Sequence, residues 1–219
     1  MRAMGSLPDV KPLFRGRLHQ VAFFVAIPAG IALVVASPTT SARVAAIVYA
    51  LALAGLYGTS ALYHRLPWSP KARRWMQRLD HSMIFVLIAG TYTPFALLVL
   101  HGAAQVVVLT VVWVGAIVGV VLKMVRIDGL KAVTATLYIG LGWLAIVAAP
   151  QIYRGLSGVS IGLLLAGGLL YTAGAIMFAA KRPNPSPRVF GYHEVWHSMV
   201  IGGSACHFVV ILLLILALR

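Results

Sequence analysis

Long apolar runs alternate with short polar connections along the whole 219-residue chain. A transmembrane helix needs roughly 20 apolar residues, whereas a barrel strand needs about ten residues of alternating character. The uninterrupted runs therefore predict helices. We place seven spans at about 21–37, 43–64, 80–100, 104–122, 132–150, 158–180 and 193–217. The expected fold class is an all-α integral membrane protein, with an N-terminal segment at 1–20 and a seven-transmembrane helix bundle at 21–219.

Composition agrees with this class, because 61% of the residues are hydrophobic and only 10% are charged. The net charge of +14 first suggests nucleic acid, but its distribution indicates topology. With seven spans, the tail and loops on one side hold 15 of the 18 Lys and Arg residues. The positive-inside rule then predicts a multi-pass protein of the cell (cytoplasmic or inner) membrane, with a cytoplasmic N-terminus and an outside C-terminus. Membrane lipids are the expected partners, nucleic acid is not, and nothing indicates the oligomeric state.

Titratable side chains gather at span ends that this topology places on one side. His193 and His197 are four residues apart, so on a helix they share one face, roughly 6 Å apart along the axis. His64 ends the second span and Asp80 begins the third, and both fall at the same cytoplasmic level. Cys206 is the only cysteine, which excludes a cysteine-based zinc cage.

Three imidazoles near one carboxylate predict a zinc site with His64, His193 and His197 as ligands. This set leaves the fourth position open for water. Asp80 either binds the ion or accepts a hydrogen bond from that water, and we favour the second. Ser60 lies one turn before His64 on the same face, where its hydroxyl could orient the water or stabilise an oxyanion.

Each of these residues also has a plainer interpretation. A single histidine at a span end is usually interfacial, and Asp80 could cap the third helix. We interpret three further histidines as interfacial, and place His207 in the last span as a cavity-lining or packing residue. Glu194 is interpreted as a solvated acid in a first helical turn. The interfacial histidines are His19, His81 and His101.

The chain resembles the bacterial haemolysin III family, within the progestin and adipoQ receptors that include the adiponectin receptors. The resemblance rests on Ser60-Ala61-Leu62-Tyr63-His64, on Arg78-Leu79-Asp80-His81-Ser82 leading into Gly90–Phe95, and on His193-Glu194-Val195-Trp196-His197. It implies seven spans, zinc held by the three histidines, and Asp80 and Ser60 close to the bound water. It also implies kinship with alkaline ceramidase-like hydrolases and a link to membrane-lipid homeostasis.

The leading hypothesis is a zinc-dependent hydrolase of a lipid acyl amide or ester, with a lipid-like substrate. The alternative is a non-enzymatic protein with structural zinc, acting as a sensor, a receptor-like module or a pore-forming cytolysin. A third hypothesis, an intramembrane zinc protease, uses Glu194 as general base in an H-E-x-x-H string. Ile127-Asp128-Gly129 resembles the aspartate motif of such proteases, but there the motif follows the H-E-x-x-H string, whereas here it precedes it in a basic loop. Full activity of Glu194→Gln would exclude this hypothesis.

Overall fold

The computed structural model describes residues 11–128 and 131–219. Their helices are α1 (Arg17–Ala36), α2 (Thr40–Arg65), α3 (Pro70–Leu98), α4 (Gly102–Val125), α5 (Lys131–Gly142), the 3-10 helix η1 (Leu144–Ala148), α6 (Ala149–Gly155), α7 (Gly158–Ala180) and α8 (Tyr192–Leu216). Seven helical segments of these ranges are long and apolar enough to cross a membrane, the fifth being Val133–Gly155. The predicted all-α, seven-span membrane fold is confirmed.

Two span boundaries differ from the prediction. The third helix begins at Pro70, ten residues before the expected start, because Ser69 caps it and proline is favoured in a first turn. The basic stretch before Asp80 is thus the first part of α3. The fifth span consists of α5, η1 and α6, with Pro150 at the start of α6. The expected segment 1–20 is described only from Lys11, and its last four residues already belong to α1.

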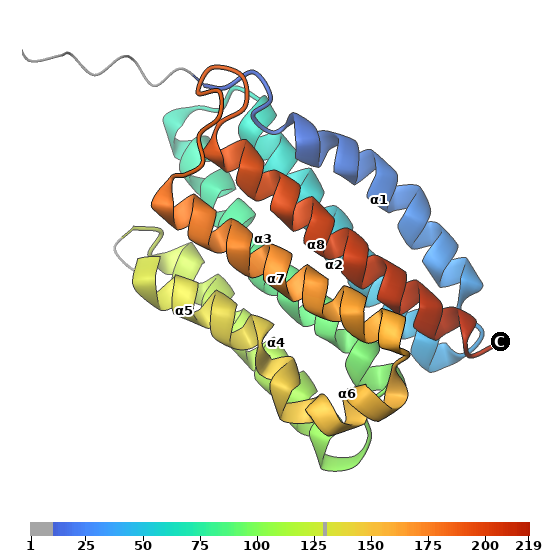
Figure 1. Cartoon of the computed structure of the whole chain (residues 1–219). Helices are drawn as coiled ribbons and strands as arrows, with labels where there is room; N and C mark the ends of the chain where they lie inside the picture. Colours follow the sequence, from blue (N-terminus) through green and yellow to red (C-terminus); the bar gives the residue numbers. More distant parts are fainter. Residues whose placement is uncertain (1–10, 129–130) are drawn as a thin grey trace, which may run out of the picture.

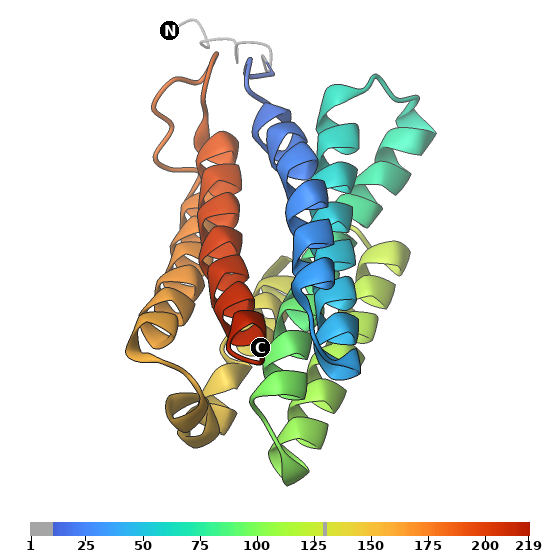
Figure 2. The same cartoon turned by 90° about the vertical axis from the view of Figure 1, so that its right-hand side faces the viewer.

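The helices form one bundle in which consecutive members lie side by side (Figures 1 and 2). α2 packs against α1 and α3, α4 packs against α3, and α8 packs against α7 and α1. Close approach of α4 to α3 requires Gly119, since a Cβ atom there would lie 2.5 Å from the Phe85 ring.

The start of α1, the α2–α3 connection and the α7–α8 connection gather at one end of the bundle (Figure 2). Most basic residues lie at this end, while Arg43, Arg154 and Arg219 lie toward the other. The three most enclosed spans are α3, α2 and α8, with 56%, 44% and 39% of their most apolar window buried, against 11–22% for the rest. These three helices carry the predicted site residues.

Candidate metal centre

Two helices bring the three predicted ligands together at the basic end of the bundle. His64 lies in the last turn of α2, and His193 and His197 lie in the first two turns of α8. One nitrogen from each ring can be chosen so that all three lie within 4.8 Å of one another. The ring centroids are 4.7–5.2 Å apart. The convergence predicted from topology is therefore present.

Two buried ring nitrogens of this cluster have no hydrogen-bond partner in the part of the chain that the structure describes, and they suit a metal ion. His64 and His197 are only 6% and 2% exposed. His64 Nε2 and His197 Nδ1 are buried without a hydrogen-bond partner among the described residues. Buried polar atoms are normally paired, so these nitrogens are available to an electron-pair acceptor. Ligands of a tetrahedral zinc ion at 2.0–2.1 Å lie about 3.4 Å apart, which small ring rotations would reach.

Asp80 lies beside the cluster. Its Oδ2 atom is 3.9 Å from His64 Nε2, and its side chain is 14% exposed. Because α3 begins at Pro70, Asp80 lies about 15 Å into the helix, so the interpretation as a helix cap is wrong. The carboxylate is placed to accept a proton, or to offset positive charge, next to the three imidazoles.

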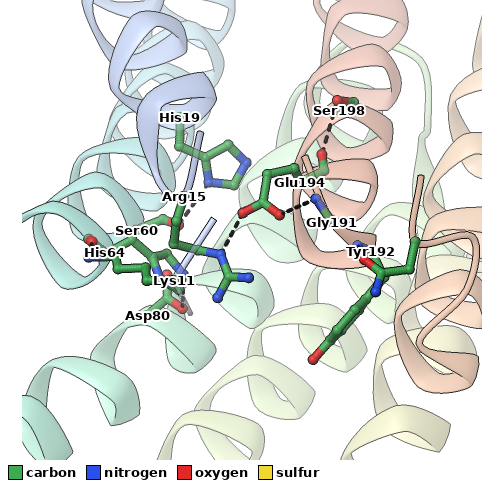
Figure 3. A network of polar contacts seen from close by, with 11 residues as sticks. Lys11, Arg15, His19, Ser60, His64, Asp80, Gly191, Tyr192, Glu194 and Ser198 are labelled. Atoms are coloured by element: carbon green, nitrogen blue, oxygen red, sulfur yellow. Dashed lines mark hydrogen bonds and ion pairs between the residues drawn. The ribbon is translucent and has the colours of Figure 1, made fainter. Parts of the chain in front are cut away.

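Ser60 is buried at 2% exposure, but its hydroxyl already has a partner. Ser60 Oγ lies 2.8 Å from Nδ1 of His19, a residue of α1 that we expected to be interfacial (Figure 3). His19 is only 3% exposed, and its ring stacks on His197 at 3.8 Å between centroids and 14° between planes. The interfacial interpretation of His19 is therefore wrong. A histidine near a span end was the same signal that selected His64.

Glu194 is completely buried, so its interpretation as a solvated acid is wrong. Oε1 pairs with Arg15 Nε at 2.5 Å, and Oε2 accepts a hydrogen bond from the Gly191 backbone N–H at 2.8 Å (Figure 3). The second contact completes a capping box at the start of α8, which satisfies a free backbone donor. Both carboxylate oxygens are engaged in holding this end of α8.

The segment 11–16 covers the same end. The Lys11 ammonium donates to the His64 carbonyl, and the backbone N–H groups of Leu13 and Phe14 donate to Arg188 and Val189 carbonyls at 3.0 and 3.1 Å. Burial, helped by nearby guanidinium groups, lowers the pKa of Lys11. Gly16 has a φ of +80°, and a Cβ atom there would lie 2.6 Å from His64 Cβ. Glycine is thus required where the chain crosses α2.

The other histidines lie apart from the cluster's three nitrogens. His101 is exposed at the start of α4, as expected, whereas His81 is half-buried with Nδ1 unpartnered in the described part of the chain. His207 lines an apolar cavity of about 240 Å³ with Tyr92, Trp143 and Leu164, among others. The cavity-lining interpretation of His207 is confirmed.

Known proteins match this chain over most of its length. The sequence pattern of a family described as "Haemolysin-III related" matches residues 9–208. Hemolysin-3 of Bacillus cereus is 38% identical over 201 residues, which cover 90% of this chain and 89% of that protein. The Hemolysin-3 homolog of Bacillus subtilis (strain 168) is 34% identical over 197 residues, covering 89% of each. The chain therefore belongs to the haemolysin III-related family of multi-pass membrane proteins.

Proposed function

We propose that the protein is a zinc-dependent membrane hydrolase that cleaves an acyl amide or ester bond of a lipid. His64, His193 and His197 hold the ion, and Asp80 and Ser60 act on the reacting groups. The observation that carries the proposal is the approach of three imidazole nitrogens, two of them from buried histidines, to within 4.8 Å of one another beside a carboxylate.

Zinc suits this donor set better than the harder cations. Neutral imidazole nitrogens are typical zinc ligands, whereas magnesium and calcium prefer oxygen. Three protein ligands leave one position for water, as in catalytic zinc sites. The carboxylate of Asp80 would offset the charge of an ion held near hydrocarbon. When bound, zinc supplies Lewis acidity, which lowers the pKa of a water toward 7 and polarises a carbonyl group.

Side chains of the protein would carry out the other parts of the reaction. Asp80, beside His64, accepts a proton from the attacking water and holds the water in line with the carbonyl carbon. Ser60, one turn deeper on α2, donates a hydrogen bond to the oxygen that becomes negatively charged. Asp80 then returns the proton to the leaving amine or alcohol. The substrate's head stays at the basic end while its chains lie among apolar helices, and the cavity beside His207 offers such space.

A closed, structural zinc site is the second candidate. It is favoured by one distance, because Asp80 Oδ2 lies only 3.9 Å from His64 Nε2 and could become a fourth ligand. The protein would then serve as a sensor, a receptor-like module or a cytolysin. The name Hemolysin-3 carried by the Bacillus cereus relative makes lysis worth testing.

A protease that uses Glu194 as general base is disfavoured by its contacts. Both of its oxygens already bind, one to Arg15 and one to the Gly191 N–H. Of the proposed aspartate motif, Gly129 lies outside the described residues.

The test is turnover of amide- and ester-linked lipids by purified protein in lipid nanodiscs, together with its zinc content. We expect His197→Ala to lose zinc and to lower turnover at least ~100-fold, and the matched His101→Ala to change neither. Zinc loss with unchanged turnover would reject the catalytic role. Release of an entrapped dye from liposomes by a hydrolytically inactive Asp80→Asn variant would instead favour a cytolysin.

A further inference from the structure

His19 lies on α1 and contacts two of the proposed site residues, Ser60 on α2 and His197 on α8. Its Nδ1 atom lies 2.8 Å from Ser60 Oγ, and its ring face lies on the His197 ring. The same ring also lies against Tyr57, with 5.1 Å between centroids and 58° between planes. These contacts fix both the position and the plane of the imidazole, and Figure 3 shows His19 directed from α1 toward Ser60.

The second ring nitrogen determines where the proton resides. His19 Nε2 is buried and has no hydrogen-bond partner among the described residues. A neutral imidazole carries one N–H group, on Nδ1 or on Nε2. A proton on Nε2 would leave a buried donor unpaired, which is costly and rare. A proton on Nδ1 leaves only an unpaired acceptor and uses the N–H in the contact with Ser60.

The direction of this contact also decides what the Ser60 hydroxyl can do. A hydroxyl has a single hydrogen, and its oxygen can accept as well. When His19 Nδ1–H donates to Ser60 Oγ, the Ser60 hydrogen is not used toward His19 and can be donated to another group.

We propose that His19 is a positioning residue for this centre. Its Nδ1–H group donates to the Ser60 hydroxyl oxygen and so leaves the Ser60 hydrogen for the reacting oxygen, while its ring face fixes the plane of the His197 imidazole. The stack and the hydrogen bond are properties of the chain alone, whereas their effect on turnover rests on the proposed function. Metal ligands are commonly oriented by such neighbours, whose loss costs 10–100-fold in metal affinity or activity.

Three variants separate the two contacts. His19→Asn places an amide N–H near the position of Nδ1, so it keeps the donor and loses the stack. His19→Phe keeps a flat ring against His197 and loses the donor. His19→Gln loses the stack, and its amide reaches the position of Nε2 instead. His101→Phe, at the exposed start of α4, is the matched control for histidine replacement.

We expect zinc affinity to fall about tenfold in His19→Asn and His19→Gln, and to stay within about threefold of the original in His19→Phe and His101→Phe. Turnover per bound zinc should fall about 10–100-fold in His19→Phe and His19→Gln, and His19→Asn should recover most of it. Melting curves of all variants, recorded in one and the same detergent, establish that each variant is folded. Equal zinc affinity in all four variants would overturn the positioning role. Equal turnover per bound zinc in His19→Asn and His19→Gln would overturn it as well.

The tautomer gives a result that needs neither zinc nor substrate. Nitrogen-15 spectra of histidine-labelled, metal-free protein, with the His19 signal assigned by its loss in His19→Asn, should show the proton on Nδ1. A proton on Nε2 would overturn the proposal. If the protein bound no zinc or hydrolysed no lipid, the proposed function would fail, yet these spectra would still decide the direction of the His19–Ser60 hydrogen bond.

Discussion

The buried pair of Arg15 and Glu194 allows one prediction to be worked out in energetic terms. Glu194 is 0% exposed and Arg15 is 20% exposed, and the two lie 2.5 Å apart. Removing one partner of a buried pair typically costs 3–5 kcal/mol, because the other charge is left buried. Since Arg15 retains some contact with solvent, we expect Glu194→Gln to lower the free energy of unfolding by about 2–3 kcal/mol. Glutamine can still accept the Gly191 N–H bond, so the helix cap is retained.

The assay is a double-mutant cycle with Glu194→Gln, Arg15→Met and both together. Unfolding is followed in mixed micelles of dodecyl sulfate and a mild detergent. The double variant should recover part of the loss, with a coupling energy of about 1.5–2 kcal/mol, because no unpaired charge then remains. Glu194→Ala should lose about 1 kcal/mol more than Glu194→Gln, since it also removes the cap. A coupling energy below about 0.5 kcal/mol, the value typical of exposed pairs, would refute this account of the N-terminal segment.

Further predictions concern metal, catalysis and packing. Incubation with a strong zinc chelator should remove the ion and lower the melting temperature, and added zinc should restore both; a melting temperature independent of zinc would contradict a bound ion in the native state. Glu194→Gln should keep turnover within a few-fold of the original, whereas a general base would lose at least ~100-fold. Gly119→Ala should destabilise the bundle by about 1–3 kcal/mol, because the new methyl group meets the Phe85 ring. Gly162→Ala, where a Cβ atom has nothing within 4 Å, should be neutral or stabilising by up to ~1 kcal/mol; equal effects of the two changes would refute the packing argument.

Much of the fold could be predicted because a bilayer imposes span length and backbone hydrogen bonding. Counting spans placed His64, Asp80 and the α8 histidines at one level, and the structure brings them together. The cytoplasmic location of this end remains a prediction from the charge distribution, as do the metal and the reaction.

Three residues at the basic end were interpreted wrongly from the sequence, two of them because their contacts come from distant segments of the chain. His19 looked interfacial because hydropathy places it at a span edge, and nothing local indicates that α8 covers it. Glu194 looked solvated because its partner, Arg15, is 179 residues away. Asp80 looked like a helix cap because the apolar run begins near it, although Ser69 and Pro70 carry the stronger start signal. For His19 and Glu194, packing at the basic end overrides the pattern along the chain, whereas the start of α3 was written in the local sequence.

The central claim is that three imidazoles bind one zinc ion. X-ray absorption at the zinc edge, on protein purified with zinc and dialysed free of excess, tests this claim most directly. We predict about one zinc per chain with three imidazole nitrogens at about 2.0–2.1 Å and one oxygen. A protein that retains no zinc, or a spectrum without imidazole ligands that is unchanged in His64→Ala, would contradict the account.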